Sequence, residues 1–87
     1  MTEIKKLYAI GLSHKTASIN IRGKFSLSNY QIHALFLDAK EREIDDLLII
    51  NTCNRTEIYA WVTSDSILID LLCKYSAGTH DDFKQFG

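Results

Sequence analysis

Two short apolar runs separated by a polar segment constrain this chain more than any other feature. Residues 47–50 read Leu-Leu-Ile-Ile, residues 58–62 read Ile-Tyr-Ala-Trp-Val, and the segment between them is Asn-Thr-Cys-Asn-Arg-Thr-Glu. Runs of this length that are bounded by turn-forming residues are typical of strands rather than helices. The sequence therefore predicts two strands joined by a tight connection, with Cys53 at its tip.

Cys53 has an unusual setting for a structural cysteine. Thr52 and Asn54 flank it and Arg55 follows, whereas Cys73 lies near the apolar stripe of an expected helix and is predicted to pack there. A nearby fixed positive charge favours the thiolate, which is the nucleophilic form of cysteine. From the residues alone two interpretations of Cys53 stay open, a small packed side chain and a reactive thiol.

The rest of the chain predicts one further strand and two helices. Residues 7–12 form a third apolar run, while residues 19–22 alternate and are left open as a short strand or an irregular turn. Ser28 and Gln31 have the spacing of a capping box, so a helix is expected to begin near Asn29. A second helix is expected after Ser64 or Asp65, with Gly78 placed to end it and a short helical turn possible over residues 81–87.

The order strand, helix, strand, strand, helix predicts the α+β class. It matches a ferredoxin-like split βαβ sandwich whose final strand is truncated. In the run at 58–62, Tyr59 and Trp61 alternate with Ile58, Ala60 and Val62, so both sheet faces should be apolar, one against helices and one against more protein. A bare strand edge tends to find a partner, so we expect self-association through the strand at 7–12 or through the Trp61 face.

Composition narrows the class of protein. The chain has 87 residues, enough for one small domain, and no apolar run approaches the roughly 20 residues of a membrane helix. The polar start lacks a secretory signal, so a cytoplasmic location without membrane attachment is expected. The cysteines and histidines lack metal-ligand spacing, and no metal is expected.

Two separated stretches carry a resemblance to a known family. Gly-Leu-Ser-His-Lys-Thr-Ala at 11–17 and Asn-Thr-Cys-Asn-Arg-Thr-Glu-Ile-Tyr at 51–59 resemble the N-terminal signatures of glutamyl-tRNA reductase. Residues 1–87 would then be the N-terminal part of the catalytic domain, without the NADPH-binding and dimerisation domains. Two departures, Ser18 in place of a usual proline and Gly23 in place of a charged helical residue, concern residues 19–25 and not the cysteine turn.

The resemblance implies an oxidoreductase. Members of the family reduce the glutamate of glutamyl-tRNA with NADPH to glutamate-1-semialdehyde, the entry to tetrapyrrole and haem synthesis. An aminoacyl ester is already activated, so a thiolate forms a thioester from it without ATP, and a thioester accepts hydride more readily than an ester. The longer protein would be a homodimer that binds NADPH downstream of this chain, and the fragment alone should reduce nothing.

The resemblance also assigns roles to single residues. Cys53 would be the nucleophile. Arg55 is suited to bind the glutamyl carboxylate through two hydrogen bonds. Thr52 and Asn54 would join Arg55 in binding the glutamyl group. His14 is a possible border of the active site, and a loop histidine that bonds the backbone is an equal interpretation.

A rival hypothesis comes from another class of protein. A noncatalytic ferredoxin-like module would bind RNA or a small effector on its sheet face, with Tyr59 and Trp61 stacking on bases. Aromatic residues at alternate strand positions more often belong to a core or an interface. The reactivity of the Cys53 thiol separates the two hypotheses.

Overall fold

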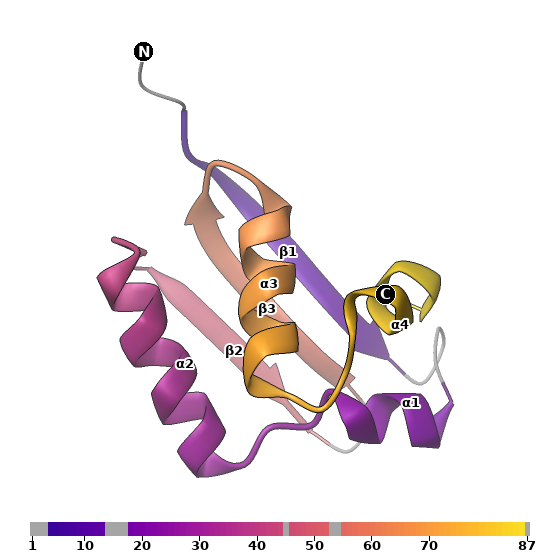
Figure 1. Cartoon of the computed structure of the whole chain (residues 1–87). Helices are drawn as coiled ribbons and strands as arrows, with labels where there is room; N and C mark the ends of the chain where they lie inside the picture. The colour runs from indigo at the N-terminus through magenta and orange to yellow at the C-terminus, as the bar shows by residue number, and fades with distance from the viewer. Residues whose placement is uncertain (1–3, 14–17, 45, 53–54, 87) are drawn as a thin grey trace.

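The computed structural model describes residues 4–13, 18–44, 46–52 and 55–86 (Figure 1). Within these ranges the strands are β1 (Lys6–Ser13), β2 (Leu47–Asn51) and β3 (Arg55–Val62), and the helices are α1 (Ile19–Lys24), α2 (Asn29–Glu41), α3 (Asp65–Tyr75) and α4 (His80–Phe86). The strands form one antiparallel sheet in the order β1-β3-β2. The predicted α+β class is confirmed.

One face of the sheet forms the core. The two-residue period of β3 places Thr56, Ile58, Ala60 and Val62 on the same face, and all four are buried. Helices α2 and α3 lie over this face, and α1 and α4 lie at the end of the sheet where β1 ends and β3 begins (Figure 1). The predicted partition of β3 into a helix-covered face and a second face is therefore correct.

The helix starts follow local chemistry. Ser28 Oγ accepts a hydrogen bond from the Gln31 N–H at 3.2 Å and Gln31 Oε1 accepts one from the Ser28 N–H at 2.7 Å, which completes the predicted capping box before Asn29. Ser64 caps α3, as one of the two predicted alternatives. None of the helices in the described part of the chain is long and apolar enough to cross a membrane.

Two local expectations differ from the structure. The alternating segment at 19–22 belongs to the helix α1, because Ser18 Oγ accepts from the Ile21 N–H and caps a helical turn there. Helix α3 ends at Tyr75 with Ser76 as its cap, so Gly78 does not end it. Gly78 instead packs against the Phe25 ring, and a Cβ at position 78 would lie 2.3 Å from two of its carbons.

The second face of the sheet keeps large apolar side chains in solvent. Leu7, Leu48 and Trp61 are each 50% or more exposed on this face. Strand β1 lies at one edge of the sheet, and no described strand pairs with its outer side. Self-association through this edge or through the Trp61 face stays a prediction.

Candidate active site

Thr52 and Arg55 close the connection between β2 and β3. The Thr52 N–H donates to the Arg55 carbonyl oxygen at 2.8 Å, and the Arg55 N–H donates to Thr52 Oγ1 at 3.2 Å. These bonds join the last described residue before positions 53 and 54 to the first described residue after them. Cys53, Asn54 and His14 lie outside the described residues, so their predicted roles stay predictions.

Asn51 anchors the base of the hairpin on the core side. Its Oδ1 accepts from the Leu27 N–H and from Thr56 Oγ1, both at 3.3 Å, and its Nδ2 donates to the Leu27 carbonyl oxygen at 2.6 Å. Leu27 and Thr56 are buried, so these bonds satisfy polar groups that have little access to water. Asn51 and Thr56, two polar residues of the cysteine motif, therefore have a structural role that the sequence did not reveal.

Arg55, Glu57 and Tyr59 form a row on the opposite face of β3. Arg55 Nε lies 3.7 Å from Glu57 Oε1, and the Tyr59 hydroxyl donates to the same oxygen at 3.0 Å. The hydrogen bond to Glu57, with burial adding to it, raises the pKa of Tyr59 above its usual value. Sequence reasoning missed Glu57, whose only signal was an acidic residue two positions after Arg55 in a strand.

The end of β1 runs beside this row. Ser13 pairs with Arg55 and Gly11 pairs with Glu57 in the antiparallel register. A shallow hollow of about 190 Å³ lies here, lined by Ala9, Ile10, Gly11, Leu12, Ser13, Glu57 and Tyr59. The two motifs that carried the family resemblance thus meet across β1 and β3, which is the arrangement that a shared site requires.

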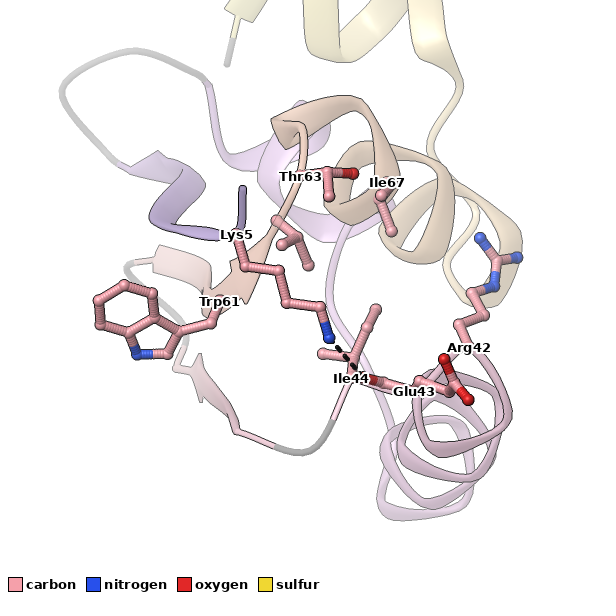
Figure 2. Close-up of a pocket in the computed structure, with 8 residues that line it drawn as sticks. Lys5, Arg42, Glu43, Ile44, Trp61, Thr63 and Ile67 are labelled. Carbon is pink, nitrogen blue, oxygen red and sulfur yellow. Dashed lines mark hydrogen bonds between the residues drawn. The ribbon is translucent and has the colours of Figure 1, made fainter. Parts of the chain in front are cut away.

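A second hollow, of about 270 Å³, lies at the far end of β3 (Figure 2). Its wall includes Trp61, and Lys5 crosses it to donate from Nζ to the Glu43 carbonyl oxygen at 3.0 Å. This bond ties the start of the chain to the end of α2, where C-terminal carbonyls lack helical partners. Its described lining residues include none that is predicted to take part in the reaction, and Trp61 among them belongs to the rival RNA-binding hypothesis.

Cys73 has the environment of a packed side chain. It is partly buried against the core, and burial, reinforced by the charges of Asp70 and Asp82, raises the pKa of its thiol. Its predicted packing role is confirmed. In the described part of the chain no three His, Cys, Asp or Glu side chains come together in a metal-binding group.

Comparison with known proteins identifies the family. The chain is a small α+β domain in which the start of β3 pairs with the end of β1. The profile of the family "Glutamyl-tRNAGlu reductase, N-terminal domain" matches residues 10–86, and the chain belongs to this family.

Its relatives include proteins named glutamyl-tRNA reductase. The chain is 46% identical over 81 residues to the protein from Christiangramia forsetii. These aligned residues make up 93% of this chain and 19% of the relative. It is 46% identical over 78 residues to that of Flavobacterium psychrophilum and 36% identical over 77 residues to that of Shewanella loihica, covering 90% and 87% of this chain and 19% and 18% of those relatives. The chain therefore spans about a fifth of the length of these curated relatives.

Proposed function

We propose that this chain is the nucleophile-bearing part of the catalytic domain of a glutamyl-tRNA reductase. Cys53 Sγ attacks the carbonyl carbon of the ester that joins glutamate to its tRNA, the tRNA hydroxyl leaves with a proton, and a thioester to Cys53 remains. Arg55 binds the side-chain carboxylate of the glutamyl group, and Thr52 and Asn54 contribute polar contacts. His14 borders the same site at the end of β1.

The hairpin between Thr52 and Arg55 is the observation that carries this proposal. Its two hydrogen bonds hold the chain on both sides of the cysteine, and the Arg55 side chain is 51% exposed beside it. An exposed guanidinium at the start of β3 can bind an acidic acyl group through two parallel hydrogen bonds. Family membership supports the assignment of the thiol to the reaction.

The reduction step belongs to the longer protein. The chain has no glycine-rich dinucleotide-binding motif, so we propose that NADPH, which would supply the hydride that yields glutamate-1-semialdehyde for tetrapyrrole and haem synthesis, is held by another domain. That protein would act as a homodimer in the cytoplasm, where cysteines remain thiols.

The sheet supports a ferredoxin-like reading of the fold. The order β1-β3-β2, with α2 and α3 on one face, is the order of three of the four strands in that sandwich, and the free edge of β1 is where the fourth would pair (Figure 1). We propose that this strand comes from the part of the longer protein that the chain lacks.

A chimera tests the proposal. Residues 10–86 replace the matching segment of the Christiangramia forsetii relative, and the product is incubated with glutamyl-tRNA carrying labelled glutamate, without NADPH. We expect a covalent glutamyl adduct that Cys53→Ala abolishes and that the matched control Cys73→Ala retains. An adduct that persists in Cys53→Ala removes Cys53 from the mechanism.

The same experiment addresses the rival, a noncatalytic module that binds RNA or an effector. Leu7, Leu48 and Asp46 surround Trp61 on the open face, and this apolar and acidic lining suits a phosphate backbone poorly. Retained tRNA binding with no adduct in any variant, and loss of that binding in Trp61→Ala, would favour the module.

A further inference from the structure

Strand β2 is an edge of the sheet that the topology leaves open. The order β1-β3-β2 places β1 and β2 at the two edges of the described sheet. The fourth strand of the proposed fold would pair beside β1, so β2 would stay an edge in the longer protein as well. Open edges attract other strands, and natural sheets protect them with charged residues or proline. The sequence of β2, Leu-Leu-Ile-Ile-Asn, includes neither.

The backbone of β2 offers hydrogen-bonding groups along this edge. In an antiparallel pair, alternate residues direct their N–H and C=O groups to the partner strand, and the residues between them direct theirs to the other side. The Thr52 N–H donates to the Arg55 carbonyl oxygen, so the even-numbered residues of β2 face β3. The backbone groups of Leu47, Ile49 and Asn51 therefore point outward, to the side where no described strand lies.

Apolar side chains flank the edge on both faces of the sheet. On the open face Leu48 is 57% exposed. On the helix side, Asp38 accepts hydrogen bonds from Lys74 and Tyr75 and so faces α3. Phe36, two residues earlier, lies about 200° around α2 from Asp38 and points away from α3. Since α3 packs on β1 and β3, Phe36 lies toward the free side of β2, and it is 40% exposed (Figure 1).

We infer that β2 pairs antiparallel with β2 of a second copy of this chain, about a two-fold axis at Ile49. Two three-stranded sheets then form one continuous sheet, and both helical layers cover the same face. In this register Leu48 lies opposite Ile50 of the second copy, so the pair on the open face is apolar on both sides. Helix α2 of the second copy lies beside α2 and covers Phe36. The contact is independent of the chemistry proposed for Cys53.

The edge is complementary to itself in this orientation. With Ile49 at the axis the whole of β2 overlaps, and the outward backbone groups of Leu47 meet those of Asn51 of the second copy. Asp46, one position before β2, then lies at the end of the second copy that carries Arg55. A parallel pairing would instead place two Asp46 carboxylates side by side. A strand of five residues buries little surface by itself, so the helix contact adds the area that a specific dimer needs.

Amide hydrogen exchange separates this contact from association through the β1 edge or the Trp61 face. The Ile49 N–H points outward at the β2 edge. Ala9 pairs with Tyr59, whose backbone faces β2, so the Ala9 N–H points outward at the β1 edge. NMR measures exchange at each residue at a low and a high protein concentration. We expect exchange of the Ile49 N–H to slow at least about tenfold at the high concentration, and that of Ala9 to stay unchanged.

The other outcomes overturn the inference. Slower exchange at Ala9 and not at Ile49 would place the contact at β1. Slower exchange at both would indicate that β2 of one copy pairs with β1 of the next. If neither amide slows, no strand edge takes part in association.

Two substitutions on α2 test the helix contact. Phe36→Ser should weaken association at least about tenfold, as measured by analytical ultracentrifugation, because it removes the ring that the second copy covers. Leu37→Ser is the matched control and should leave association unchanged. Leu37 is more exposed, at 54%, but lies about 100° further around α2, away from both α3 and the sheet.

Circular dichroism confirms that both variants are folded. An unchanged dissociation constant in Phe36→Ser would contradict the helix contact, and so would an equal loss in Leu37→Ser. If Phe36→Ser does not fold, amide exchange in the parent chain still decides between the edges.

Discussion

The side-chain amide of Asn51 forms a closed pair of hydrogen bonds with the backbone of Leu27. Nδ2 donates to the Leu27 carbonyl oxygen at 2.6 Å, and Oδ1 accepts from the Leu27 N–H at 3.3 Å. This pair links the last residue of β2 to the segment that enters α2. The cysteine hairpin is thereby attached to the helical layer, and its base cannot move independently of the core.

We expect Asn51→Ala to destabilise the chain by about 2 kcal/mol, because both backbone groups of Leu27 lose their partner in a buried place. Urea unfolding followed by circular dichroism measures the change. Thr56→Val is the matched control, since it removes a single bond to Asn51 at nearly constant volume. Its cost should be about half as large, and equal costs would show that the Leu27 pair adds nothing.

The two glycines at positions 78 and 23 should respond oppositely to alanine. A Cβ at Gly78 would lie 2.3 Å from the buried Phe25 ring, so Gly78→Ala is expected to cost about 2–3 kcal/mol through overpacking. A Cβ at Gly23 in α1 meets nothing within 4 Å, so Gly23→Ala should stabilise by about 0.5–1 kcal/mol. Thermal unfolding measures the two variants, and the unfolding temperature should fall for Gly78→Ala and rise for Gly23→Ala. An unchanged unfolding temperature in Gly78→Ala would contradict the packing of Phe25.

Local patterns predicted the parts of the fold that depend on neighbours in sequence. The apolar runs at 47–50 and 58–62 became β2 and β3, and the Ser28 and Gln31 spacing gave the start of α2 to the residue. Each of these signals involves residues at most five positions apart. Side-chain period and capping chemistry act at that range, so the sequence alone is sufficient for them.

Contacts between distant segments were not predictable in this way. Glycine is a common residue just after the end of a helix, which is why Gly78 was expected to end one. Its contact with Phe25 instead depends on how α1 and α3 come together. The close approach of the Glu57 side chain to Gly11 depends on the register that pairs the two residues. In the candidate site the sequence indicated Arg55 and Cys53 by residue type, whereas the hydrogen bonds of Asn51 to the Leu27 backbone depend on how the segment before α2 meets the sheet.

Asp38 makes the stability of the chain depend on pH. Its carboxylate accepts hydrogen bonds from Lys74, Tyr75 and Arg42, and these donors, Lys74 first, hold the pKa of Asp38 well below its usual range. A depressed carboxyl pKa contributes stability that is present above about pH 4 and is lost as the pH falls further.

We therefore expect Asp38→Asn to cost about 1–2 kcal/mol at pH 7, a figure that allows for the solvent-exposed Lys74 and Arg42. The difference in the free energy of unfolding between Asp38→Asn and the parent chain should shrink steadily as the pH falls below about 4. Urea unfolding at several pH values measures it. Glu41→Gln, which removes a carboxylate charge from the end of the same helix, is the control for the change in net charge. A constant difference across this range would mean that the carboxylate charge is not what links α2 to α3.

Exposed apolar side chains on the open sheet face should drive self-association. Trp61 is 50% exposed beside Leu7, its partner across β1 and β3. We expect the apparent mass from light scattering to rise with concentration, and Trp61→Ser to reduce that rise. Tyr30→Ser, which removes a more exposed aromatic ring from α2, should not. A monomeric mass at high concentration contradicts the prediction of self-association. If Trp61→Ser still associates, the edge of β1 is the other contact predicted from the sequence.

We expect the two cysteines to differ in reactivity. Burial and the nearby Asp70 and Asp82 raise the pKa of Cys73, whereas Arg55 follows Cys53 by two positions in the sequence, and a neighbouring guanidinium favours a thiolate. We expect iodoacetamide at pH 7 to modify Cys53 at least about tenfold faster than Cys73, as measured by mass spectrometry of the separated peptides. Arg55→Gln should slow Cys53 and leave Cys73 unchanged, which makes Cys73 an internal control for folding. If Cys53 reacts no faster than free cysteine, the thiol is not activated in this chain, which contradicts the prediction of an activated nucleophile.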